Sequence, residues 1–108
     1  MQRSKTKMEL VLDEASNVVQ HQLPPLLWLK PLTENFVELC SGLVRFEEML
    51  ESADISDQQR HDLKSSQAEL LRNTLALGQR IQKSLPAEQM QRLQELSIQL
   101  RQLTTESN

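Results

Sequence analysis

The chain carries apolar residues at alternating spacings of four and three, and this rhythm constrains its fold more than any other feature. The clearest run is Leu32, Phe36, Leu39, Leu43, Phe46, Leu50 and Ala53. Residues three and four apart lie on one face of an α-helix, so the run predicts a helix that buries one side. Two glycines and four prolines supply little material for the tight turns of an antiparallel sheet. The sequence therefore predicts an all-α protein.

The same rhythm recurs in four segments, which proline and polar capping residues separate. We predict four helices within one domain spanning 1–108, at approximately 5–23, 32–53, 57–84 and 87–103. The segment 24–31 is an apolar linker bounded by prolines, and residues 104–108 form a frayed tail. A chain of 108 residues has material for one compact domain.

Three boundary signals support these ranges. Pro31 suits the first turn of the second helix, because the amide hydrogen that proline lacks has no partner there in any case. Ser56 and Gln59 fit a capping box, in which each side chain accepts a hydrogen bond from the other residue's backbone amide. Pro86 indicates a helix restart, although one long third helix kinked at Pro86 fits the same pattern.

Small and polar residues inside the apolar faces indicate how the helices pack. Gly42 lies within the apolar face of the second helix, and we expect it to allow a neighbouring helix to approach closely. Gln67 and Thr74 lie on the apolar stripe of the third helix; they either fix a register within the seam or lie at its solvent-exposed edge, and we favour the edge. The expected architecture is a three- to four-helix antiparallel bundle or an elongated helical hairpin assembly, with dimerisation as a further way to complete the core.

The charge distribution argues against nucleic-acid binding as the main role. The formal net charge is -3 and the pI is near 5.4. Residues 34–57 hold seven acidic side chains and one basic, whereas residues 58–108 hold seven basic and five acidic. Phosphate binding depends on clustered Lys and Arg, which release counterions. We interpret these charges as ordinary solvated helix faces.

Cysteine content and hydropathy together predict a cytoplasmic protein. Cys40 is the single cysteine, so no internal disulfide can form and a reducing compartment is favoured. The basic segment 1–7 is not followed by a signal-peptide core, because Glu9, Asp13 and Glu14 interrupt the apolar residues. No stretch approaches the roughly 20 apolar residues of a membrane helix. We expect no membrane association.

Few residues in the chain could bind a metal. His61 and Asp57 are four apart and share a face of the third helix, but nothing adjacent completes the four ligands of a structural zinc site. His21 has no carboxylate or cysteine at ligand spacing. Cys40 lies within a wide apolar face and is best interpreted as a buried hydrophobic residue. We therefore predict no metal.

The chain also offers little for catalysis. Glu47, Glu48 and Glu51 bring carboxylates together, yet acids on the outer face of an amphipathic helix are normally solvated. Gly42 and Gly78 are isolated inside helices, so there is no glycine-rich phosphate loop. We predict that the protein is not an enzyme, binds no cofactor and acts on no small-molecule substrate.

The apolar residues that could contact a partner fall into two groups. Trp28, with Leu26, Leu27 and Leu29, forms an apolar cluster between prolines, and Trp is often energetically important at protein interfaces. Trp28 either closes one end of the bundle or docks a partner, and we favour closure. The second group comprises leucines of the third and fourth helices: Leu71, Leu75, Leu93, Leu96, Leu100 and Leu103.

The sequence thus favours a non-enzymatic interaction module, an adaptor, regulator or export-type chaperone, that presents an apolar helical face to another protein or to a second copy of itself. In size, acidity and helical content the chain resembles the flagellar and type III secretion chaperones, a resemblance of general make-up that no motif carries. One alternative is a small ligand-binding bundle centred on the acidic residues of the second helix. The other is a nucleic-acid-associated regulator that uses basic residues of the third helix: Arg60, Lys64, Arg72, Arg80 and Lys83.

Overall fold

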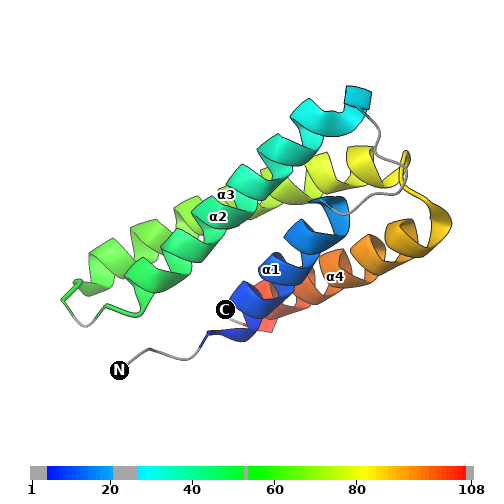
Figure 1. Cartoon of the computed structure of the whole chain (residues 1–108). Helices are drawn as coiled ribbons and strands as arrows, with labels where there is room; N and C mark the ends of the chain where they lie inside the picture. The colour runs from blue at the N-terminus through cyan, green and yellow to red at the C-terminus, as the bar shows by residue number, and fades with distance from the viewer. Residues whose placement is uncertain (1–4, 21–26, 53, 107–108) are drawn as a thin grey trace.

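A computed structural model describes residues 5–20, 27–52 and 54–106, and within these ranges the chain is all-α, with no strand (Figure 1). The prediction of an all-α fold is confirmed. Four α-helices and one short 3₁₀ helix follow in chain order: α1 (Lys7–Gln20), η1 (Leu27–Leu29), α2 (Lys30–Leu50), α3 (Asp57–Gln82) and α4 (Ala87–Glu106).

Successive helices run in opposite directions and close into a four-helix bundle (Figure 1). Helix α1 packs against α2 and α4, and α3 packs against the same two helices from the other side. The bundle measures 46 × 29 × 22 Å. Of the two architectures that the sequence allowed, the bundle is the one observed. Because α3 is the longest helix and α1 the shortest, the α2–α3 hairpin projects beyond the ends of α1 and α4 (Figure 1).

The ends of the helices are set by local signals, several of which the sequence predicted. The capping box at α3 is confirmed: the Ser56 hydroxyl accepts a hydrogen bond from the Gln59 amide at 3.1 Å, and the Gln59 side chain accepts one from the Ser56 amide at 2.8 Å. Pro31 lies in the first turn of α2, as predicted. Thr6 caps α1, since its hydroxyl accepts a hydrogen bond from the Glu9 amide.

Several predicted boundaries differ from the structure: α1 begins at Lys7 rather than 5, α3 ends at Gln82 rather than 84, and larger differences occur in α4 and α2. Helix α4 extends to Glu106, so residues 104–106 are helical rather than a frayed tail. Thr104 supports the extra turn by donating a hydrogen bond from its hydroxyl to the Leu100 carbonyl. Helix α2 begins at Lys30 and ends at Leu50, earlier at both ends than the predicted 32–53. The predicted end of the first helix at 23 and the linker residues 24–26 lie outside the described residues.

Pro86 separates two helices. Helix α3 ends at Gln82 and α4 begins at Ala87, and the two helices pack against each other. The alternative of a single kinked helix is therefore wrong. The Pro86 carbonyl accepts the first hydrogen bond of α4, from the Met90 amide at 2.8 Å.

The core is aliphatic and receives side chains from every helix. Its completely enclosed members come from η1 and all four α-helices: Leu12, Val19, Leu29, Leu43, Ile81, Leu93, Leu96 and Leu100. Thr74 is enclosed with them, and its hydroxyl donates a hydrogen bond to the Leu70 carbonyl at 2.7 Å. The expected position of Thr74 at a solvent-exposed edge is therefore wrong. A threonine tolerates this burial because its own helix supplies the hydrogen-bond acceptor.

The seam between α2 and α3 is built around two glycines. A methyl group added at Gly42 would lie 3.2 Å from the Leu70 side chain, and one added at Gly78 would lie 3.2 Å from the ring of Phe36. Each glycine therefore receives a large side chain from the facing helix. The expectation that Gly42 allows close helix packing is confirmed.

Candidate functional site

Most of the leucines predicted to bind a partner lie inside the bundle. Leu71 and Leu75 of α3 are buried, as are three leucines of α4: Leu93, Leu96 and Leu100. Leu103 is partly buried and packs against this core. The structure thus places these side chains in contacts within the chain. A partner could reach the buried ones only if the helices separated.

The apolar cluster around Trp28 divides into an inner and an outer residue. Leu29 is completely enclosed in the core, whereas Trp28 next to it is 65% exposed, the highest value among the large hydrophobic residues that are described. Leu26 lies outside the described residues, and of Leu27 only its place in η1 is described. Leu29 therefore closes this end of the bundle, and the favoured interpretation of Trp28 as the closing residue is wrong.

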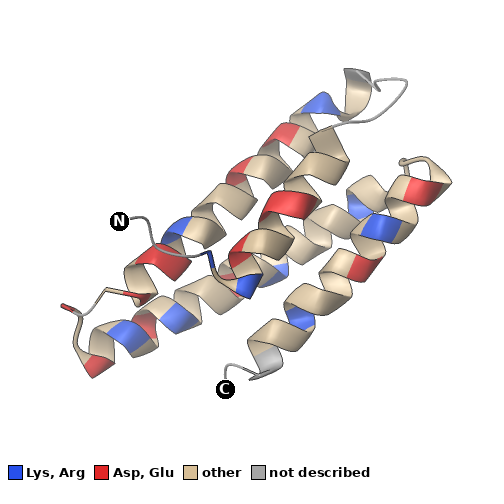
Figure 2. Ribbon diagram, turned by 60° about the horizontal axis from the view of Figure 1, so that its bottom comes forward, with Lys and Arg blue, Asp and Glu red and all other residues tan. Residues whose placement is uncertain are grey.

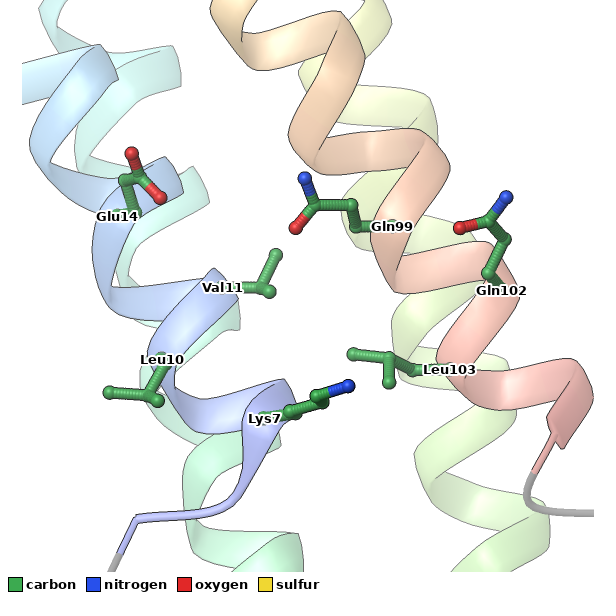
Figure 3. A pocket seen from close by; sticks show the side chains of 7 residues that line it. All are labelled: Lys7, Leu10, Val11, Glu14, Gln99, Gln102 and Leu103. Carbon is green, nitrogen blue, oxygen red and sulfur yellow. The ribbon is translucent and has the colours of Figure 1, made fainter.

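A groove of about 410 Å³ lies between the first half of α1 and the last half of α4 (Figure 3). Val11 points from α1 toward α4, while Leu10 points away from α4 at the rim. Leu10 is 55% exposed. The lining is Lys7, Leu10, Val11, Glu14, Gln99, Gln102 and Leu103. Apart from Leu103, the sequence interpretation did not single out these residues as a site. The exposed face of a helix as short as α1, with 14 residues, can be identified only when the side covered by the other helices is known.

An ion pair joins α1 to α4 at one end of this groove. The Arg92 guanidinium donates hydrogen bonds to Glu14 of α1 and, at 3.0 Å, to Glu95 of its own helix. The carboxylates of Glu14 and Glu95 raise the pKa of Arg92 above its usual value. Lys7 lies at the other end, and within the described part of the chain its ammonium group makes no ion pair. The groove thus has an apolar floor with opposite charges at its two ends.

Two of the basic residues proposed for nucleic-acid binding make local contacts within the bundle. The Arg60 side chain donates a hydrogen bond to the Leu50 carbonyl and so caps the end of α2. Lys64 lines a smaller groove beside Leu50 and Leu71. Figure 2 shows Lys and Arg on all four helices.

The residues considered for chemistry do not gather into a metal-binding cluster within the described part of the chain. Cys40 is buried, and burial raises the pKa of its thiol to about 11; the Asp13 charge adds to the rise, while a hydrogen bond with Ser16 opposes it. His61 and Asp57 are both exposed on α3. Among the described residues, no three His, Cys, Asp or Glu side chains gather closely enough to hold a metal ion.

Comparison with known proteins adds no relative. No family model matches the chain, and no significant match is found among the curated proteins or the solved structures. None of the described helices is long and apolar enough to cross a membrane. The functional proposal therefore depends on the surface of the bundle itself.

Proposed function

We propose that the chain is a non-enzymatic protein-interaction module, an adaptor, regulator or export-type chaperone, that docks another protein through Trp28. The observation that carries the proposal is the exposure of this side chain. Trp28 is 65% exposed, although its neighbour Leu29 is completely enclosed. Leaving the largest apolar side chain of the protein in water is unfavourable, and binding a partner would remove this cost.

The position of Trp28 favours binding because its backbone is already held in place. Leu29 anchors η1 in the core, and α2 follows it without a break. Trp28 thus directly precedes a buried residue, Leu29, and Leu29 adjoins the start of a helix of 21 residues. An aromatic side chain on an anchored backbone loses little conformational freedom on binding, which is the property of residues that dominate interfaces.

The same residue reports on its own binding. Trp28 is the only tryptophan, and the chain contains no tyrosine, so fluorescence excited in the indole band comes from this site alone. We expect the free protein to emit as a solvated indole. Addition of the partner should shift the emission to shorter wavelength. An emission spectrum that stays unchanged when a partner is saturated would contradict docking at Trp28.

A pair of matched variants tests the proposal in cell extract. Trp28→Ala removes the proposed contact, and Met49→Ala removes another exposed apolar side chain at the far end of α2. Both should fold, because neither side chain belongs to the core. We expect a partner captured by the wild-type chain and by Met49→Ala to be lost with Trp28→Ala. Equal capture by all three chains would overturn the proposal.

We also propose that the protein works in the cytoplasm. Cys40 supports this placement, because a lone cysteine buried as a thiol suits a reducing compartment. Fractionation of the source cells, followed by detection of the chain, tests the proposal directly. Recovery outside the cytoplasm would contradict it.

A further inference from the structure

The outer face of α1 carries four residues that are self-complementary: an antiparallel copy of the same helix would match them in charge and apolar character. Lys7, Leu10, Val11 and Glu14 are four of the seven residues that line the α1–α4 groove. Lys7 and Glu14 are equally far along the helix from the midpoint between Leu10 and Val11. A two-fold axis through that midpoint therefore exchanges position 7 with 14 and position 10 with 11. An antiparallel copy of the helix centred on that midpoint would set each lysine against a glutamate and each leucine against a valine.

The helical geometry puts these residues where such pairing needs them. Successive residues of an α-helix are about 100° apart, so Leu10 and Val11 flank the line that joins Lys7 and Glu14. Figure 3 shows this arrangement, with Val11 on the side of α4 and Leu10 on the opposite side. A two-fold axis through the midpoint carries Leu10 of a second copy to the side of Val11, which is the side on which the groove lies.

We propose that this face of α1 is the interface of a symmetric homodimer, in which Leu10 of each chain enters the α1–α4 groove of the other. Two identical surfaces related by a two-fold axis must be self-complementary, and this face has that property. The groove supplies an apolar floor of Val11 and Leu103 for the incoming leucine. The dimer buries Leu10 of both chains and so removes two exposed apolar side chains from water.

Charge selects a second copy as the occupant. Lys7 has no ion pair within the described residues, and in the dimer it faces Glu14 of the second copy. Glu14 already binds Arg92, so each end of the interface becomes a carboxylate between two cations. The antiparallel orientation is enforced, because a parallel copy would set lysine against lysine and glutamate against glutamate.

The mass of the chain in solution gives the first test. We expect light scattering to show a mass that rises with concentration from 12.5 kDa toward about twice that value. Leu10→Asp should raise the dimer dissociation constant by more than about tenfold. Ile98→Asp is the matched control, since Ile98 is exposed on α4 and outside the groove, and it should leave dimerisation unchanged. A chain that stays monomeric into the millimolar range overturns the proposal.

Charge reversal tests the pairing itself. Lys7→Glu leaves four carboxylates at the interface, and Glu14→Lys leaves four ammonium groups, so each variant alone should be monomeric. Mixed together, the two variants should form a heterodimer, because every contact between positions 7 and 14 then joins a glutamate of one chain to a lysine of the other. Lys30→Glu makes the same charge reversal as Lys7→Glu, but at an exposed lysine of α2. This control variant should dimerise as the wild type does. Two reversed variants that fail to associate when mixed would rule out this pairing.

Disulfide trapping tests the register. Position 10 lies about 1.5 Å along the axis from position 10 of the second copy, whereas position 17 lies about 20 Å from its counterpart. Leu10→Cys should therefore cross-link on mild oxidation, and Asn17→Cys should not. Cys40 does not compete, because its thiol is buried. Rapid cross-linking of Asn17→Cys would contradict the antiparallel register.

The dimer is independent of the interaction proposed for Trp28. Trp28 lies on η1, which follows the opposite end of α1 from Lys7. Trp28→Ala should therefore dimerise as the wild type does, and Leu10→Asp should retain the partner captured through Trp28. Either proposal can fail while the other holds.

Discussion

The α2–α3 seam and the α1–α4 seam join helices in the same antiparallel manner but differ in how tightly they close. Between α2 and α3, Gly42 and Gly78 each receive a large side chain from the facing helix. Between α1 and α4, the ion pair of Glu14 with Arg92 joins the helices beside a groove of about 410 Å³. The first seam is closed where its two glycines lie, whereas the second has room for another side chain.

The difference in closure distinguishes the helices that maintain the bundle from the helix that is open to a second molecule. Helices α2 and α3 are the two longest of the bundle, and they keep its shape through contacts within the chain. Helix α1 has 14 residues and leaves Leu10 exposed at the rim of the groove. A tightly closed seam contributes stability, and an open seam offers a place for a second molecule. Substitutions in the seams test this division, from the largest expected effect to the smallest.

Truncation of Phe36 should have the largest effect. Its ring is buried against Gly78 in the α2–α3 seam, so Phe36→Ala should lower the free energy of unfolding by about 3–5 kcal/mol. Leu10→Ala, on the open seam, should cost less than about 1 kcal/mol. Urea denaturation of the monomeric chains measures both. Similar losses would show that the two seams are equally closed.

The α1–α2 seam should weaken at high pH because of Cys40. Burial raises the pKa of this thiol from 9.0 to about 11, so the folded chain holds its proton more tightly than the unfolded chain does. The stabilisation is complete below pH 9 and is lost as the pH rises to about 11, a change of about 2–3 kcal/mol. Stability measured between pH 8 and pH 11 should fall more steeply for the wild type than for Cys40→Ala. An equal fall in stability with pH for the two proteins would show that the Cys40 thiol does not cause the loss.

The two glycines of the α2–α3 seam should respond differently to alanine. Alanine favours a helix interior by roughly 1 kcal/mol over glycine. At Gly42 the neighbour is the end of the partly buried Leu70 side chain, which can turn aside, so Gly42→Ala should stabilise the chain. At Gly78 the neighbour is the buried ring of Phe36, which cannot, so Gly78→Ala should give no gain or a loss. Thermal melts should show a higher midpoint for Gly42→Ala and no such rise for Gly78→Ala.

Removal of the Arg92 guanidinium should have the smallest effect. Its ion pairs with Glu14 and Glu95 are exposed, so water and salt screen them. Arg92→Gln should change the stability less than any substitution above, and the difference from the wild type should disappear in high salt. A loss that persists in high salt would mean that contacts of the Arg92 side chain other than its exposed ion pairs hold the α1–α4 seam together.

Features that depend on neighbouring residues in the chain were predictable from the sequence. The capping box of Ser56 and Gln59, the place of Pro31 and the close approach at Gly42 all follow from backbone hydrogen bonding or side-chain size at a single position. The apolar rhythm likewise indicated all four helices. Each of these signals acts within one or two helical turns.

Features that depend on which helix faces which were not predictable. Trp28 and Leu29 are adjacent and both apolar, yet only Leu29 reaches the core, because the direction in which η1 joins α2 decides between them. Thr74 was expected at an edge, because the sequence does not show how far the neighbouring helices cover the apolar stripe of α3. The outer face of α1 was missed for the same reason. The residues that it exposes follow from the positions of α2 and α4.

The chain order of the bundle has a consequence for how it folds. Three of its seams join helices that follow one another, but the α1–α4 seam joins residues as far apart as Glu14 and Arg92, separated by 78 positions. Such a distant contact forms after the local hairpins, because the intervening chain must first be ordered. We expect the beginning of α1 and the end of α4, which lie at the same end of the bundle (Figure 1), to exchange their amide hydrogens earliest. Association of two chains across this seam would then slow the exchange where the single chain opens most readily.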